Sequence, residues 1–491
     1  MHFRAAVHGC AIAACTTLFA CGGGSHGAPR NLLLISVDGL RADHLGCFGQ
    51  ERDLSPNVDR LAEESALFEA AISPTPTTLP ANVSLLTGDY PHRHGVARDG
   101  YRVAPDNALL AELLAAAGFR TAGFVGSSRL GAETGFDAGF EDFDGAPARR
   151  LSGAPPIERP ADRVTDAALA WPGYTGDGER PWFVFVDYGD PCAPYEPPPP
   201  FEGRFRGRPL ATANGAEEIA HVAPRLRAAA GSGYRSLADV EEGFRERASD
   251  SLVEAANLAR ELAGDYAAEV AFVDHEIGRL LDDLRGRGLL DDTLVVLTAG
   301  HGETLFEHAD VFSHGSSVYD TELRVPLVVR VPHGGSAGLR VPAVVSLVDV
   351  APTVLELLGL TPPAGLDGRS LAAALGGAEL PPRPAFAEAS APAGAPFGGD
   401  PLWENRGRFQ AVRTERYKYM FRRPDGQARL YDVVADPLEQ HDLLRDADYD
   451  ADLAGRLEQQ LVEWWSDVGR GRSPDRASGP PQQEPGAAED R

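Results

Sequence analysis

The chain has 491 residues, of which 43% are hydrophobic, so it can bury the core of one large domain and a smaller one. Its formal net charge of −26 at pH 7 argues against a nucleic-acid partner or direct binding to an anionic membrane surface, because both need a basic face.

The first 20 residues read as an export signal rather than as part of the fold. Arg4 supplies a positive start, an apolar stretch follows, and the sequence Leu-Phe-Ala-Cys ends at Cys21. This pattern resembles a bacterial lipoprotein signal, which is cleaved before a cysteine that then carries a diacylglyceryl group. We therefore predict lipidation at Cys21 and a flexible tether over 21–29. Cys15 is a rival lipidation site, and a plain signal peptide is the alternative.

The expected location is the bacterial cell envelope, in the periplasm or on the outer surface. No later stretch reaches the roughly 20 apolar residues that a membrane span needs, so the lipid anchor is the only membrane contact predicted. Export to an oxidising compartment would permit a bridge between Cys47 and Cys192, although we favour two separate thiols.

Continuous apolar runs alternate with helical patterns through the first three quarters of the chain. The run 31–37 ends at Asp38 and is typical of a central strand buried on both faces. Apolar residues at steps of three and four predict a helix over 262–287. Such alternation predicts an α/β fold whose chemistry lies at the carboxyl ends of strands. Further strands are predicted at 182–186, 293–297 and 325–329.

The composition changes in two places. Residues 201–260 are polar and read as an insertion, and from about 386 the chain shows the pattern of short antiparallel strands followed by a helix near 451–466. We therefore predict a large domain over 30–385, a C-terminal subdomain over 386–470, and a disordered tail over 471–491.

Acidic and histidine residues recur just after the predicted strands. Asp38 ends the first strand, His301 and Glu303 follow the strand near 293–298, and His314 comes shortly afterwards. Thr78 lies two residues before Pro80, which suits the first turn of a helix. Thr78 could simply cap this helix, or it could act as a nucleophile whose alkoxide is stabilised by the helix N-terminus and a cation.

Many motifs in order resemble the sulfatase family of the alkaline-phosphatase-like superfamily. The resemblance implies a central mixed sheet flanked by helices with a small C-terminal antiparallel sheet, and it covers roughly residues 30–445. The segments that carry it are 36–47, 54–62, 84–91, 94–96, 118–122, 190–195, 301–303, 325–327, 347–354, 366–371 and 413–437.

The resemblance also implies roles for individual residues. Thr78 and His301 are the expected catalytic residues, and together with Asp38 they are the expected metal ligands. His314, Asn82 and Lys418, the chain's single lysine, are expected at the substrate. The implied cofactor is a divalent metal, either calcium or, for phosphatase-like chemistry, zinc or manganese.

Four positions depart from the family pattern. Thr78 stands where sulfatases have a Cys or Ser that becomes formylglycine, and Asn82 stands where they have an Arg or related branches a His. Gly300 replaces a metal-binding Asp and contributes no ligand atom. Cys192 replaces a His, and as a thiolate it could bind a soft metal.

The sequence thus predicts a metal-dependent hydrolase of sulfate or phosphate esters at the cell envelope. The expected partner is a small anionic ester, or a sulfated or phosphorylated glycan or lipid. Two alternatives stay open. One is a catalytically impaired lipoprotein that binds an anionic ligand or a partner, and the other is an envelope enzyme that transfers a phospho-alcohol group.

Overall fold

The computed structural model describes residues 29–145, 158–175, 180–207, 252–308, 312–315, 317–390, 408–423 and 426–466. The predicted signal, most of the tether and of the 201–260 insertion, and the 471–491 tail lie outside these residues. Among the helices described, none is both long enough and apolar enough to cross a membrane.

The elements alternate along the chain as the sequence pattern predicts. The strands are β1 Asn31–Val37, β2 Ala66–Ile72, β3 Arg120–Val125, β4 Asp142–Asp144, β5 Trp182–Tyr188, β6 Thr293–Thr298, β7 Arg324–Val325, β8 Leu327–Arg330, β9 Leu339–Ser346, β10 Ala385–Ala389, β11 Arg408–Arg413, β12 Tyr417–Arg423 and β13 Gln427–Asp432. The α-helices are α1 Pro56–Glu63, α2 Thr78–Thr87, α3 Pro91–His94, α4 Leu110–Ala116, α5 Ala161–Leu169, α9 Leu252–Gly286, α10 Asp320–Leu323, α11 Val350–Leu357, α12 Ala372–Leu375 and α13 Ala451–Ser466.

The large sheet has nine strands, and β1 lies near its centre. The strand order is β4-β3-β5-β1-β6-β8-β2-β7, with β9 paired to β2. β1 runs parallel to both β5 and β6. All seven of its residues are buried because helices cover both faces of the sheet, which explains why its sequence is apolar without alternation.

The other half of the sheet makes it mixed. β8 runs antiparallel to β6, and β2 runs antiparallel to β8. The apolar run predicted as one strand at 325–329 forms two, β7 and β8, on either side of Pro326. Pro326 causes this difference, because proline has no N–H to donate to a neighbouring strand.

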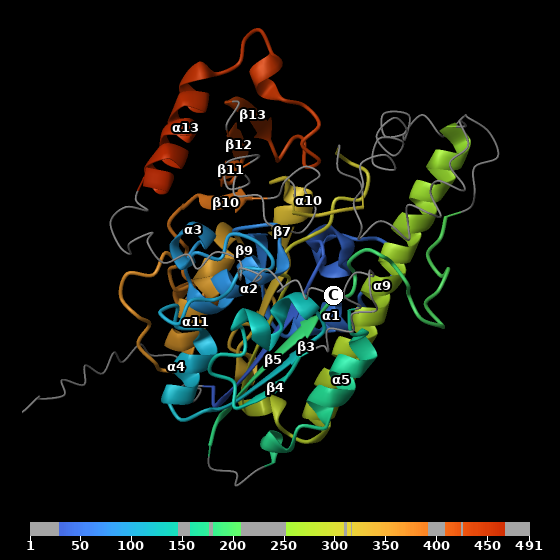
Figure 1. Cartoon of the computed structure of the whole chain (residues 1–491), viewed down its shortest axis with the longest axis vertical. Coiled ribbons are helices and arrows are strands. Elements are labelled where there is room, and N and C mark those ends of the chain that lie inside the picture. The colour runs from blue at the N-terminus through green and yellow to red at the C-terminus, as the bar shows by residue number, and fades with distance from the viewer. Residues whose placement is uncertain are drawn as a thin grey trace, which may run out of the picture.

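Helices cover the sheet from both sides. In Figure 1, α5 and α9 lie on one side of the strands, and α2, α3, α4 and α11 lie on the other. The helix predicted at 262–287 is part of α9, which already begins at Leu252. Asp274 of α9 accepts the backbone N–H groups of Asn57 and Val58, and so fixes the first turn of α1 against the longer helix.

The C-terminal region forms a separate layer. Strands β10 to β13 make a four-stranded antiparallel sheet, drawn with α13 at the top of Figure 1. One face packs Ala411 and Met420 against Ile72 and Val344 of the large sheet's strands, whereas α13 covers the other face. The fold class predicted from the sequence is confirmed: a mixed sheet flanked by helices, with a small antiparallel sheet after it.

Candidate active site

Asp38 lies at the centre of the site. Its backbone N–H donates to the carbonyl of Tyr188 at 2.9 Å, so it sits where the carboxyl ends of β1 and β5 meet. The side chain is 1% exposed. Burial and the nearby Asp187 carboxylate raise the pKa of Asp38 well above its ordinary value. Its Oδ1 is buried and has no hydrogen-bond partner among the described residues, which marks a place for a cation or a donor.

Thr78 and His301 come together beside Asp38. Thr78 is fully buried in the first turn of α2, and its Oγ1 lies 3.3 Å from Nε2 of His301. Nδ1 of His301 is 2.9 Å from the carbonyl of Gly302, which can only accept, so Nδ1 carries the proton. Burial and the neighbouring His314 lower the pKa of His301 to about 3. The imidazole is therefore neutral, and its free Nε2 accepts the hydroxyl of Thr78.

His314 completes this group from the loop after β6. Its ring stacks on that of His301, with the centroids 4.2 Å apart. Its Nδ1 lies 2.7 Å from Oε2 of Glu303, and the hydroxyl of Tyr195 donates to Oε1 of the same carboxyl at 3.2 Å. Burial raises the pKa of Glu303 to about 8 and lowers that of His314 to about 4. Glu303 thus orients the ring of His314 within a buried polar network.

Cys192 faces the two histidines. One ligand atom from each of Cys192, His301 and His314 lies within 4.8 Å of the other two. The thiol is buried and free, and burial together with the Glu158 and Glu303 carboxylates raises its pKa well above the ordinary value. Cys47 is also free, so the interpretation of two separate thiols is confirmed.

Asn82 and Gly300 lie against the same pocket but are closely packed. Asn82 accepts the hydroxyl of Ser36 at 2.9 Å and donates to the backbone carbonyl of Thr78 at 3.0 Å, so it ties β1 to α2. A Cβ built on Gly300 would lie 2.8 Å from Oδ1 of Asp38. A side chain at position 300 would therefore require Asp38 to move.

These contacts decide which metal the residues suit. The expected set of Asp38, Thr78 and His301 offers one carboxylate, one hydroxyl and one nitrogen, whereas calcium takes six to eight oxygen ligands. Gly300 supplies none, so the set does not fit calcium. The nitrogen and sulfur atoms of His301, His314 and Cys192 instead suit a softer divalent metal.

Arg129 is a site residue that the sequence reasoning missed. It lies just after β3, and its charge lowers the pKa values of Asp38, His301 and His314. Its Nε is 3.1 Å from Asp99 Oδ2. Its position just after β3, another parallel strand of the sheet, is the sequence signal that could have identified Arg129.

Asp99 connects Arg129 to the start of α2. Its Oδ1 accepts the backbone N–H of Leu79 at 2.8 Å, in the helix's first turn. A carboxylate is thus held between a helix N-terminus and a guanidinium, the arrangement that proteins use to bind anions.

Lys418 lies elsewhere, inside the contact between the two sheets. Its side chain is fully buried, and Nζ lies 2.7 Å from Asp320 Oδ1 and 2.9 Å from Glu439 Oε1. Arg413 also pairs with Asp320, at 3.1 Å. The lysine that the resemblance places at the substrate is therefore enclosed by its own ion pairs.

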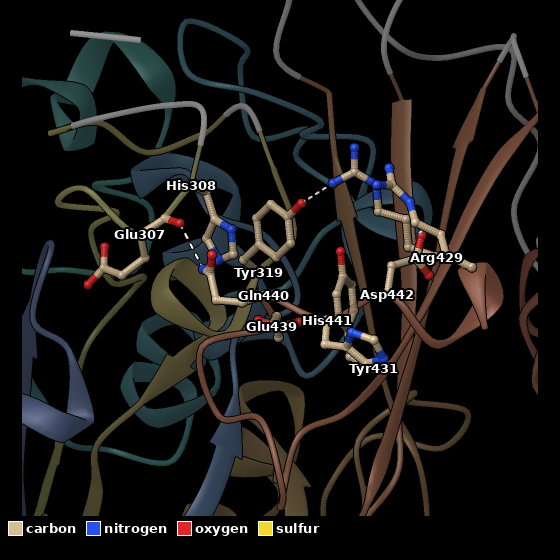
Figure 2. A pocket seen from close by; sticks show the side chains of 10 residues that line it. Glu307, His308, Tyr319, Arg429, Tyr431, Glu439, Gln440, His441 and Asp442 are labelled. Carbon is tan, nitrogen blue, oxygen red and sulfur yellow. Dashed lines mark hydrogen bonds and ion pairs between the residues drawn. The ribbon is translucent and has the colours of Figure 1, made fainter. Parts of the chain in front are cut away.

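A polar cavity of about 330 Å³ opens beside this cluster. Figure 2 shows the loop after β6 on one side and residues of the C-terminal region on the other. His308 stacks flat on Tyr319 with the ring centroids 3.5 Å apart, and the hydroxyl of Tyr319 accepts a hydrogen bond from Arg429. Gln440 bridges the two sides by donating to the carbonyl of Glu307 at 2.8 Å. Aromatic faces and charged groups thus line the cavity together.

Comparison with known proteins agrees with this picture. The family model described as Sulfatase matches residues 30–360. The ulvan-active sulfatase of Formosa agariphila is 27% identical, over 88% of this chain and 81% of its own length. The N-acetylglucosamine-6-O-sulfatase of Bacteroides thetaiotaomicron is 24% identical, over 85% and 83% respectively. The crystal structure of the phosphonate monoester hydrolase of Agrobacterium radiobacter superposes with a TM-score of 0.69 at 25% identity, covering 90% of this chain and 96% of that one.

Proposed function

The chain belongs to the sulfatase family, a family of sulfuric ester hydrolases, and from this premise we propose that it hydrolyses sulfate or phosphate esters with the help of a divalent metal. The observation that carries the proposal is the hydroxyl of Thr78, which lies 3.3 Å from the unprotonated Nε2 of His301 at the start of α2. A hydroxyl within reach of an acceptor, at the positive end of a helix, is the arrangement of an activated nucleophile.

In the proposed reaction, the oxygen of Thr78 attacks the sulfur or phosphorus of the ester. A bond from Oγ1 to the central atom forms as the bond to the leaving alcohol breaks, and the proton of the hydroxyl ends on the alcohol. Water then attacks the same central atom, which releases sulfate or phosphate and returns a proton to Oγ1. His301 orients the hydroxyl because its Nε2 accepts the hydroxyl's hydrogen bond, and the backbone carbonyl of Gly302 holds the ring in place. A bound divalent cation would supply charge that stabilises the alkoxide form of the nucleophile.

We propose that Arg129 and the first turn of α2 hold the anion of the substrate. Both already bind a carboxylate, that of Asp99, at 3.1 Å and 2.8 Å. A sulfate or phosphate group carries the same charge and similar acceptor oxygens, so we propose that it takes the place of this carboxylate when it binds. This role replaces the cationic side chain that position 82 lacks.

The alcohol part of the substrate is proposed to be a sugar. Two relatives that match this chain over 85% or more, the ulvan-active sulfatase and the N-acetylglucosamine-6-O-sulfatase, are named for glycan substrates, which supports a glycan ester.

A binding protein without turnover is the second candidate. The packing around Gly300 favours this candidate. A Cβ at position 300 would lie 2.8 Å from Oδ1 of Asp38, so the pocket as it stands leaves no room for a side chain there. A site in that condition would keep the anion-binding groups Arg129 and Thr78 and lose the family's metal ligand.

We propose that the protein acts at the cell envelope, anchored through Cys21. Support comes from the sequence of the first 21 residues alone. Cys21→Ser should shift the protein from the membrane fraction to the soluble fraction and abolish incorporation of a labelled fatty acid. Unchanged labelling in the variant would exclude Cys21 as the lipidated residue.

One experiment separates hydrolase from binding protein. Turnover of an aryl sulfate, an aryl phosphate and a phosphate diester is measured for the wild type, Thr78→Ala and Thr78→Ser. Turnover in the wild type that is lost in the alanine variant supports the hydrolase. Absence of turnover in the wild type, with the sulfated sugar still bound, supports the second candidate.

A further inference from the structure

We propose that Cys192, His301 and His314 form a zinc site whose open position faces Asp38 and Thr78. The inference goes beyond the proposed hydrolysis, because it concerns which metal the pocket selects and can be tested without any substrate. Its basis is the convergence of one sulfur and two nitrogen atoms within 4.8 Å of one another in the interior.

The chemistry of these three atoms selects the metal. Thiolate and imidazole are the ligands that zinc prefers, whereas calcium and magnesium need oxygen. Three protein ligands with a fourth position open is the usual composition of a catalytic zinc site. Cys192 therefore acts here as a metal ligand.

The hydrogen bonds behind the histidines point their free nitrogens into the pocket. Nδ1 of His301 is held by the carbonyl of Gly302 at 2.9 Å, and Nδ1 of His314 faces the carboxyl of Glu303 at 2.7 Å. Zinc-bound histidines almost always have such a partner, either a backbone carbonyl or a carboxylate, on the nitrogen that does not touch the metal. Tyr195 in turn fixes Glu303, so each ring is supported from behind.

The open side of the site carries an atom that needs a partner. Oδ1 of Asp38 is buried, has no hydrogen-bond partner among the described residues, and lies 3.9 Å from Nε2 of His301. Thr78 Oγ1 lies 3.3 Å from the same nitrogen. The hydrogen bond from Thr78 to this nitrogen belongs to the metal-free site. Once zinc takes the nitrogen, the hydroxyl of Thr78 would face the metal's open position, and the metal in place of His301 would orient it. A doubly charged ion would also offset the buried carboxylates of Asp38 and Asp187.

Of the three ligands, His314 is the most exposed to solvent. The side chain of His314 is 16% exposed, whereas His301 is fully buried and Cys192 is 5% exposed. The least buried ligand is therefore placed to receive the metal first. The zinc site explains two departures from the family pattern together. Gly300 removes an oxygen ligand, and Cys192 adds a sulfur ligand.

The test measures bound metal directly. The full chain is stripped with a chelator and dialysed against zinc, calcium or manganese, and the bound ions are counted by mass spectrometry. We expect about one zinc per chain and no stoichiometric calcium. Cobalt added to the stripped protein should give the charge-transfer band of a thiolate-bound ion.

Variants make the test specific to these ligands. Cys192→Ser should lose the cobalt–thiolate band. Cys192→Ser and His314→Ala should each weaken zinc binding by more than about tenfold, because losing a residue that only supports a ligand, such as Glu303, already lowers metal affinity about 10- to 100-fold. Cys47→Ser, which removes the other free thiol of the described residues, should bind zinc as the wild type does.

Two results would overturn the zinc site: stoichiometric calcium in place of zinc, or a cobalt–thiolate band that survives in Cys192→Ser. Circular dichroism of the variant confirms that it is folded. Thr78→Ala should keep its zinc, so a failure of the hydrolase proposal and a failure of the zinc proposal give different results.

Discussion

Replacing Lys418 by methionine tests whether this residue joins the two sheets or touches substrate. In the structure Nζ lies 2.7 Å from Asp320 and 2.9 Å from Glu439, and its side chain is fully buried. Methionine fills a similar volume without the charge. The change therefore removes the cation while leaving the packing of β12 largely intact.

The expected loss follows from which carboxylate is left alone. Breaking a buried ion pair by removing one partner costs about 3–5 kcal/mol. Asp320 keeps Arg413 at 3.1 Å, so the uncompensated charge is that of Glu439, and we expect the lower end, about 3 kcal/mol. Adding Glu439→Gln should restore most of the loss, because the amide oxygen can still accept the backbone N–H of Asp320 as Glu439 does.

The loss should also depend on pH. Burial raises the pKa of Glu439 in the folded protein, and removing Lys418 raises it further. A carboxyl group whose pKa is raised in the folded state binds more protons there than in the unfolded state. Its contribution to the free energy of unfolding therefore falls as pH rises above about 4.3, the carboxyl pKa of the unfolded chain. The deficit of Lys418→Met should therefore be larger at pH 8 than at pH 6.

Urea unfolding followed by tryptophan fluorescence measures these differences, since Trp464 of α13 stacks on Phe386 of the C-terminal sheet. Arg416→Met is the control, because Arg416 is 62% exposed in its pair with Asp432 and its loss should leave the free energy of unfolding nearly unchanged. If Lys418→Met unfolds like the wild type but loses turnover, the lysine contacts substrate and the reasoning is wrong.

Four further changes address the site itself. Thr78→Ser should keep most of the turnover of an aryl ester while Thr78→Ala loses it; equal rates in the two variants would remove Thr78 as nucleophile. In steady-state assays, Arg129→Met should lower kcat/KM by about 10²-fold, because the substrate's anion loses a hydrogen-bond donor. An unchanged kcat/KM would mean that Arg129 only forms its ion pairs. Asn82→Ala should cost about 2–4 kcal/mol in urea unfolding, because two buried partners lose their hydrogen bonds. Gly300→Ala should cost about 1–3 kcal/mol through contact with Asp38, whereas Gly455→Ala, in open space on α13, should cost nothing.

Much of the fold could be predicted because its strongest patterns are local. β1 and β6 are buried throughout and carry uninterrupted apolar runs at 32–35 and 294–297, since both faces are covered, and α9 repeats its apolar residues at helical spacing. The break at Pro326 was the exception, since proline's missing N–H matters only once a neighbouring strand is in place.

The site was predictable in position but not in its contacts. Asp38 and His301 follow parallel strands, whose carboxyl ends must meet at one edge, and this placed them together. The contacts that each side chain makes depend on how segments far apart in the sequence pack against one another. The pairing of Lys418 with Asp320 and the approach of Cys192 to His314 are contacts of that kind.

The most direct test of the account is ester hydrolysis at known metal content. Wild type and Thr78→Ala are loaded with the same metal, the bound ion is counted, and turnover of aryl sulfate and aryl phosphate is measured side by side. We expect turnover of at least one ester by the wild type and none by Thr78→Ala at equal metal content. Equal rates in the two proteins, or no turnover by a fully loaded wild type, would contradict it.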